Sequence, residues 1–135
     1  GVPVKWMPRL KQAEDYVDEA GEIIPNEKLT FSPPPSKSYA FCSDTRFSES
    51  TIASVKGVDM LYHEATFLND QEELAGKTFH STARQAAQVA RRAGVKTLLL
   101  GHFSSRYKNL EPFVNEARGV FPESFIAEEG KTFDV

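Results

Sequence analysis

The sequence has too few cysteines to cross-link a fold and no apolar run long enough to anchor it in a membrane. Its 135 residues include a single cysteine, Cys42, which excludes an internal disulfide and a cysteine zinc cluster and favours a reducing compartment. No apolar run approaches the ~18 residues of a membrane span, and no signal-peptide pattern opens the chain. We therefore expect a cytoplasmic protein with no membrane partner.

The chain also lacks a strong excess of either charge. A net charge of −3 with 26% charged residues is typical of a soluble protein and does not favour a nucleic-acid binder, although it leaves room for a local basic patch. With 40% apolar residues, a chain of this length can bury about two-thirds of its unfolded surface. These values predict one globular domain.

What the chain does contain is three apolar runs that end in reactive side chains. A buried strand that leads into a polar loop is how α/β sheets present chemistry at the carboxyl ends of their strands. Because three runs share this design, we expect them to form one site. Residues 39–43 lead to Asp44, residues 59–62 lead to His63 and Glu64, and leucines 98–100 lead through Gly101 to His102.

The spacing of the apolar residues predicts an α/β fold in which strands alternate with helices. We expect strands at 1–4, 39–43, 60–62, 98–100, 125–127 and 131–135, a hairpin over 16–24, and helices at 48–55, 70–75, 81–93 and 110–118. The proline-rich segment 32–36 should be a stiff connector and not a domain boundary.

The clearest helix begins at Ser81, the expected N-cap, and ends before Gly94. Five alanines form a narrow stripe along it at helical spacing: Ala83, Ala86, Ala87, Ala90 and Ala93. Such a stripe of small side chains lets the helix lie close against a sheet.

Five side chains are candidate metal ligands: Asp44, His63, Glu64, His80 and His102. Carboxylate oxygen and imidazole nitrogen suit zinc or manganese. No pair of histidines has the His-x-His or His-x3-His spacing of a local zinc motif, so this set would complete one ion at most. The alternative is that Asp44 begins the next helix and that His80 only precedes a helix cap.

The first eleven residues carry Lys5, Arg9 and Lys11 without an acid, and Trp6 lies among them. Basic residues beside an aromatic side chain suit a phosphate backbone with a base or sugar to stack on. The alternative is a solvated loop that one tryptophan anchors.

Four motifs follow one another along the chain: Ser43-Asp44-Thr45, His63-Glu64-Ala65-Thr66-Phe67, Phe79-His80-Ser81-Thr82 and His102-Phe103-Ser104-Ser105-Arg106-Tyr107. In order, spacing and identity they resemble the C-terminal half of ribonuclease Z, the tRNA 3′-processing endonuclease family of the metallo-β-lactamase superfamily. The resemblance covers essentially the whole chain. Ser43 and Ala13 stand where the family often has glycine.

The resemblance implies roles for individual residues. Asp44 matches the aspartate that bridges two zinc ions, and His102 matches a ligand of the second ion. Glu64 and His80 match a pair implicated in proton transfer during phosphodiester cleavage. The substrate-binding residues would be Lys5, Arg9 and Lys11 in the family's substrate-side loop, and Arg106 and Tyr107 near the tRNA 3′ end.

The resemblance also implies an α/β fold that is one αβ half of a four-layer αββα sandwich, and a homodimer. Its implied activity is the zinc-dependent endonucleolytic removal of the 3′ trailer from precursor tRNA. The family's His-x-His-x-Asp-His motif, which supplies most zinc ligands, and its tRNA-gripping arm are absent from residues 1–135. We therefore expect the C-terminal portion of such a domain, with an incomplete site for the two zinc ions and no activity alone.

Two alternatives stay open: another metallo-β-lactamase-fold phosphodiesterase or arylsulfatase, and a non-catalytic module that binds RNA or a partner protein. The ribonuclease Z interpretation predicts that Asp44 and His102 lie at adjacent strand ends with ligand atoms roughly 3–4 Å apart. It also predicts a hydrogen bond between Glu64 and His80, and no tightly bound dinuclear zinc in the isolated chain. It also predicts an exposed sheet face, prone to self-association, that carries Phe41, Leu61 and Leu99.

Overall fold

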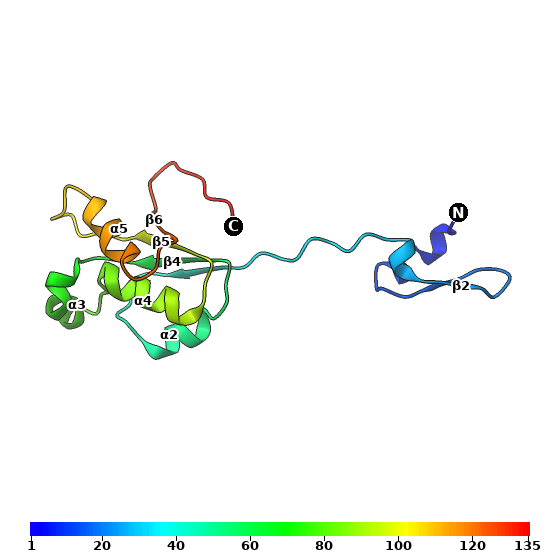
Figure 1. Cartoon of the computed structure of the whole chain (residues 1–135), viewed down its shortest axis with the longest axis horizontal. Helices are drawn as coiled ribbons and strands as arrows, with labels where there is room; N and C mark the ends of the chain where they lie inside the picture. Colours follow the sequence, from blue (N-terminus) through cyan, green and yellow to red (C-terminus); the bar gives the residue numbers. More distant parts are fainter. The chain divides into compact units, whose positions relative to one another are not determined.

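The structure, a computed structural model, describes all residues from 1 to 135 and divides them into two compact units, Gly1–Ser36 and Lys37–Val135 (Figure 1). The expected connector at 32–36 contains no helix or strand. The expectation that it is not a domain boundary is wrong, because the two units meet at its end. Consecutive prolines cannot donate to a strand ladder or continue a helix, so this segment bonds little to either unit.

The first unit is built from short elements. A 3₁₀-helix, η1 (Val4–Trp6), runs into a helical turn, α1 (Met7–Leu10), and the antiparallel hairpin of β1 (Tyr16–Val17) and β2 (Ile23–Ile24) precedes a second 3₁₀-helix, η2 (Asn26–Lys28). The hairpin is confirmed. The expected strand at 1–4 is wrong, because Pro3 precedes a helical turn and Pro8 fits the first turn of a helix, where no N–H donor is needed.

The second unit is an α/β layer with four parallel strands (Figure 1). They lie in the order β3 (Tyr39–Cys42), β4 (Met60–Glu64), β5 (Thr97–Gly101) and β6 (Ser124–Ile126). The helical elements are α2 (Glu49–Ser54), η3 (Asn69–Gln71), α3 (Glu72–Thr78), α4 (Ala83–Ala93) and α5 (Glu111–Arg118). The α/β class is confirmed. The expected strand at 131–135 is wrong, because Lys131 instead turns back to donate its N–H to the carbonyl of Glu128.

Helix α4 is the longest helix and carries the predicted alanine stripe, which is buried. Its N-cap is Thr82 and not Ser81: the Thr82 hydroxyl accepts from the N–H of Gln85, and the Gln85 side chain accepts from the N–H of Thr82. Gly94 ends the helix with a φ of 66°. None of the helices is long and apolar enough to cross a membrane.

Helices α2, α4 and α5 cover one face of the sheet, and the opposite face carries no helix. On the covered face, Leu61, Leu98 and Leu100 pack with the helices in one core. On the open face, Phe41 stacks on Tyr62 with ring centroids 4.5 Å apart, and Phe41 is 63% exposed. This is the expected αβ half of a sandwich.

The expected exposed face is wrong at two positions: Leu61 lies on the other face, and Leu99 lies on the open face but is only 5% exposed. The strand register pairs Phe41 with Tyr62 and Tyr62 with Leu99, but it pairs Leu61 with Ala40 and Leu98. Because neighbouring residues of a strand point to opposite faces, Leu61 lies under the helices. The exposed aromatic side chains of the open face are therefore Tyr39, Phe41 and Phe125.

Candidate metal-binding and catalytic site

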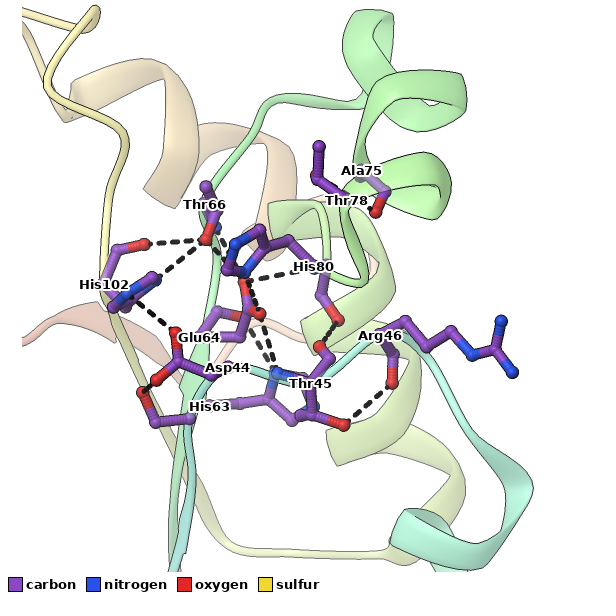
Figure 2. A network of polar contacts seen from close by, with 12 residues as sticks. Asp44, Thr45, Arg46, His63, Glu64, Thr66, Ala75, Thr78, His80 and His102 are labelled. Carbon is purple, nitrogen blue, oxygen red and sulfur yellow. Dashed lines mark hydrogen bonds and ion pairs between the residues drawn. The ribbon is translucent and has the colours of Figure 1, made fainter.

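The site lies where three parallel strands end. Asp44 follows β3, Glu64 is the last residue of β4, and His102 follows β5 directly. His80 comes from the connection between α3 and α4. Because the carboxyl ends of parallel strands meet at one edge of a sheet, these four side chains converge (Figure 2).

The backbone turns sharply at two of these positions. Asp44 has a φ of 49° and His102 a φ of 55°, and Phe79, next to His80, has a φ of 60°. A residue other than glycine in this left-handed region costs roughly 1–3 kcal/mol, and such residues gather at functional sites. The sequence carries no clear signal for these conformations, although aspartate and histidine adopt them more readily than most residues.

Asp44, His80 and His102 form one cluster of potential ligands. The Nε2 atom of His102 lies 3.1 Å from Oδ1 of Asp44, which confirms the expected proximity of these two groups. The expectation that they follow adjacent strands is wrong, because β4 lies between β3 and β5. One ligand atom from each of the three residues lies within 4.8 Å of the others. The rings of His80 and His102 stack with centroids 5.3 Å apart. A carboxylate and two imidazoles at these distances fit a zinc-type divalent cation.

Glu64 organises the cluster from below the surface. Its fully buried carboxylate accepts from the backbone N–H of Thr45, Thr66 and Ser81 at 2.9, 3.1 and 3.1 Å. It also accepts from the Thr66 hydroxyl at 2.7 Å and from Nδ1 of His80 at 2.8 Å, which confirms the predicted Glu64–His80 bond (Figure 2). Five protein donors occupy both oxygens, so Glu64 orients its neighbours and does not reach into the site.

The hydrogen bond to Glu64 fixes which ring nitrogen of His80 carries a proton. A carboxylate can only accept, so Nδ1 of His80 carries a proton and Nε2 is the atom available to a ligand. The His80 side chain is 23% exposed, so a ligand can approach it. The same carboxylate also caps the following turn, because it accepts from the N–H of Thr66.

His63 lies outside the cluster. It is fully buried on the helix-covered face of β4, where Nδ1 donates to the carbonyl of Glu64 at 2.8 Å and Nε2 has no partner. Burial lowers the pKa of the His63 imidazole. A neutral histidine in the core cannot serve the site at the strand ends.

The loop after β5 brings Arg106 near the cluster. Its guanidinium lies 5.1 Å from the ring centroid of Phe67, and Phe67 packs edge-on against His80. Tyr107 points inward instead: its hydroxyl accepts from the N–H of Leu68 at 3.3 Å, and its ring packs against the buried Phe113. Arg106 is therefore exposed beside the site, whereas the contacts of Tyr107 are structural.

In the first unit, Lys5, Arg9 and Lys11 are all exposed. Arg9 lies 4.5 Å from the ring centroid of Trp6 and pairs with Glu14 at 2.7 Å, and Trp6 packs edge-on against Tyr16. Trp6 thus anchors this unit, as the alternative reading had it, while the cations remain accessible.

A cavity of about 480 Å³ opens beside His102, and sequence reasoning did not foresee it. Tyr62, Gly101 and Glu128 contribute to its walls. A Cβ atom at residue 101 would overlap the Tyr62 ring, so any larger residue there would have to displace that ring. Burial, with the nearby Tyr39, Asp44 and Glu64, raises the pKa of Tyr62. The cavity gives a substrate room next to the cluster.

Residues 28–103, more than half of the chain, match the family model described as beta-lactamase superfamily domain, so the chain belongs to this family. It is 48% identical over 134 residues to ribonuclease Z from Parabacteroides distasonis, covering 99% of this chain and 44% of that protein. The chain spans less than half the length of the curated relatives it matches.

Two solved structures support the fold. The metallo-beta-lactamase fold protein YhfI from Bacillus subtilis aligns with a TM-score of 0.68 and 26% identity, over 73% of this chain and 40% of that one. A long form RNase Z from yeast aligns with a TM-score of 0.56 and 31% identity, over 64% of this chain and 12% of that one. The predicted resemblance and fold class are confirmed.

Proposed function

We propose that this chain is part of a zinc-dependent endoribonuclease that removes the 3′ trailer from precursor tRNA. The observation that carries the proposal is the convergence of Asp44 and His102 with a Glu64-bound His80 at one sheet edge. Relatives named ribonuclease Z, which this chain matches over nearly its whole length, support the substrate class. The activity belongs to a longer protein, and we expect the isolated chain to be inactive.

Asp44 and His102 would hold metal in this enzyme. Zinc bound there supplies a Lewis acid and an activated water as nucleophile. A closed zinc site needs about four ligands, and these two residues provide only part of that set. The complete enzyme would hold two ions through further histidines, whereas the isolated chain should lose zinc to a chelator during dialysis.

His80 is the proposed proton donor. Its Nδ1 is held by Glu64, so its ring is oriented and the positive charge of its protonated form is balanced. In this protonated form, the proton on Nε2 of His80 can pass to the oxygen that leaves when the phosphodiester breaks. Glu64 is a positioning residue for this step, because its own oxygens are occupied.

The substrate-binding residues are proposed from exposure and charge. Arg106 lies beside Phe67 at the edge of the site, where a phosphate of the RNA would meet it. Lys5, Arg9 and Lys11 present further cations in the first unit. We keep Tyr107 in this set as a residue that shapes the loop around Arg106.

The open sheet face supports the proposal that half of the sandwich lies elsewhere in the protein. Phe41, Tyr39 and Phe125 are exposed there as large aromatic side chains, and a second αβ layer would bury them. Residues 1–135 would then be the C-terminal portion of the domain. A homodimer, which the resemblance implies, and a cytoplasmic location, which was expected from the composition, remain predictions.

The test is cleavage of a precursor tRNA by the full-length protein. His80→Ala should lower kcat by about 10²–10⁴-fold and leave tRNA affinity nearly unchanged, because the proton is needed only as the leaving oxygen departs. Lys77→Ala is the matched control, since Lys77 pairs only with Glu73 on the surface of α3. Weakened tRNA binding with intact turnover would contradict the role of His80.

The same assay separates the alternatives. Hydrolysis of a simple phosphodiester or an aryl sulfate without cleavage of precursor tRNA would identify another phosphodiesterase or an arylsulfatase. Binding of RNA without any turnover would indicate a non-catalytic module.

A further inference from the structure

Thr66 occupies an unusual position between the two halves of the site. It is 6% exposed and lies two residues beyond Glu64. Its hydroxyl oxygen contacts three groups: Oε2 of Glu64 at 2.7 Å, Nδ1 of His102 at 2.9 Å and the carbonyl of His102 at 3.1 Å (Figure 2). No other side chain is hydrogen-bonded to both Glu64 and His102.

A count of protons sets the direction of these bonds. A hydroxyl has one hydrogen to donate, and the shortest of the three contacts is to a carboxylate, which can only accept. The Thr66 hydrogen therefore goes to Glu64 and not to the carbonyl of His102, which also only accepts but lies further away and is uncharged. The contact with Nδ1 of His102 then needs the ring nitrogen as donor, so Nδ1 carries the proton.

The backbone keeps Thr66 in this place. Its N–H donates to Oε2 of Glu64 at 3.1 Å, and its carbonyl accepts from the N–H of Ser104 at 3.1 Å. The hydroxyl is thus held between the end of β4 and the loop after β5. The carbonyl of His102 is a second acceptor in reach at 3.1 Å, but the carboxylate of Glu64 is nearer and charged.

We propose that Thr66 is a positioning residue that fixes the tautomer of His102 and keeps its Nε2 free of a proton. That Nε2 lies 3.1 Å from Oδ1 of Asp44. A proton on Nε2 would form a hydrogen bond to the Asp44 carboxylate, and neither atom could then bind a cation. Without that proton, Nε2 of His102 and Oδ1 of Asp44 can both bind the same cation. Through Thr66, Glu64 orients His102 as well as His80.

This inference rests on the proposed metal site and has a readout of its own. Long-range ¹H–¹⁵N correlation spectra of the metal-free chain distinguish protonated from unprotonated ring nitrogens. Neutral His102 should carry its proton on Nδ1 in the wild type and in Thr66→Ser, which keeps the hydroxyl. In Thr66→Val, which keeps the shape and loses the hydroxyl, the proton should move wholly or partly to Nε2.

Zinc affinity gives the second readout, measured by competition with a chromophoric chelator. Thr66→Val should weaken binding by about 10–100-fold, as losses of outer hydrogen-bond partners do at metal sites. Thr66→Ser and the control Thr78→Val should bind zinc like the wild type, because the Thr78 hydroxyl bonds only within α3.

The outcomes separate the two proposals. A full-length wild-type protein that binds no zinc, together with a His102 that is protonated on Nδ1 in the metal-free chain, would count against the metal site and support the role of Thr66. Neutral His102 with its proton on Nε2 in the wild type would overturn the role of Thr66, as would a Thr66→Val variant with unchanged tautomer and unchanged zinc affinity. If Thr66→Val does not fold, the wild-type tautomer and Thr66→Ser still decide.

Discussion

The two units of the chain are stabilised in different ways. In Gly1–Ser36 only Leu10 and Tyr16 are buried, and the side chain of Asn26 links α1 to the hairpin region by donating to the carbonyls of Leu10 and Glu14. In Lys37–Val135 a continuous apolar core joins the sheet to three helices. Each hydrogen bond contributes about 1 kcal/mol net, whereas a buried core residue contributes several times more.

The two units also carry different groups of proposed functional residues. The four converging residues of the site all lie on the core-stabilised unit, where packing holds their geometry. Three of the five proposed RNA-binding residues lie on the unit with little core. Such a unit opens at low free energy and can adapt to a flexible strand, whereas chemistry needs fixed positions.

The largest expected effect comes from replacing one phenylalanine in each unit with alanine and comparing the two losses of stability. Phe113 is fully buried in the second unit, so Phe113→Ala should lower the free energy of unfolding by about 3–5 kcal/mol. Phe31 is 99% exposed in the first unit, so Phe31→Ala should change it by less than about 0.5 kcal/mol. Urea unfolding measures both. Equal effects would break the comparison.

A matched pair of acids comes next. In Glu64→Gln an amide NH₂ group must face either the His80 side or the Thr66 side, and both present donors, so we expect a loss of about 2–3 kcal/mol. Glu14 pairs with Arg9 on the surface, and Glu14→Gln should cost less than about 0.5 kcal/mol. Chemical denaturation of both variants tests this. A near-neutral Glu64→Gln would mean that the carboxylate is not the organising group.

The pH dependence should also differ between the units, because all three histidines lie in the second. The pKa of buried His63 is lowered, so on acidification the unfolded chain takes up its proton first. Stability is fully present above about pH 6.5 and is lost below it, by at most about 1.4 kcal/mol per pH unit from this group. His63→Leu should flatten that slope in denaturation curves between pH 7 and pH 5 (roughly the histidine range). If the slope of stability against pH does not change, other titrating groups are responsible for it.

The smallest effect concerns the first unit alone. Ala13 has a φ of 62°, a conformation that costs an alanine roughly 1 kcal/mol and a glycine nothing. Ala13→Gly should therefore slow amide exchange in residues 1–36 and leave the second unit unaffected. Faster exchange in the first unit would show that the greater freedom of unfolded glycine outweighs the relieved strain.

Much of the second unit could be predicted from the sequence, because two periodic signals are strong there. The alanine spacing predicted α4 and its buried stripe. Apolar runs that end in Asp44, Glu64 and His102 predicted three strand ends at one edge, since parallel pairing leaves no other arrangement. The Asp44–His102 and Glu64–His80 contacts were predicted from the family resemblance together with this placement of the strand ends.

What could not be predicted depends on contacts between distant residues. The face of the sheet on which Leu61 lies is set by the strand register, which no local pattern specifies. The N-cap moved from Ser81 to Thr82 because the Ser81 hydroxyl bonds to the carbonyl of Thr45. The role of Thr66 depends on His102, which lies 36 positions further along the chain.

The order of the strands has a consequence for how the protein folds. Each strand of the sheet pairs with the next one in the chain, β3 with β4, β4 with β5 and β5 with β6. Each pairing therefore closes only one crossover, which favours fast folding for a parallel sheet. On a ribosome the sheet can grow strand by strand as the chain emerges. Because Asp44, Glu64 and His102 follow or end the first three strands of this sheet, the site needs no residue from β6.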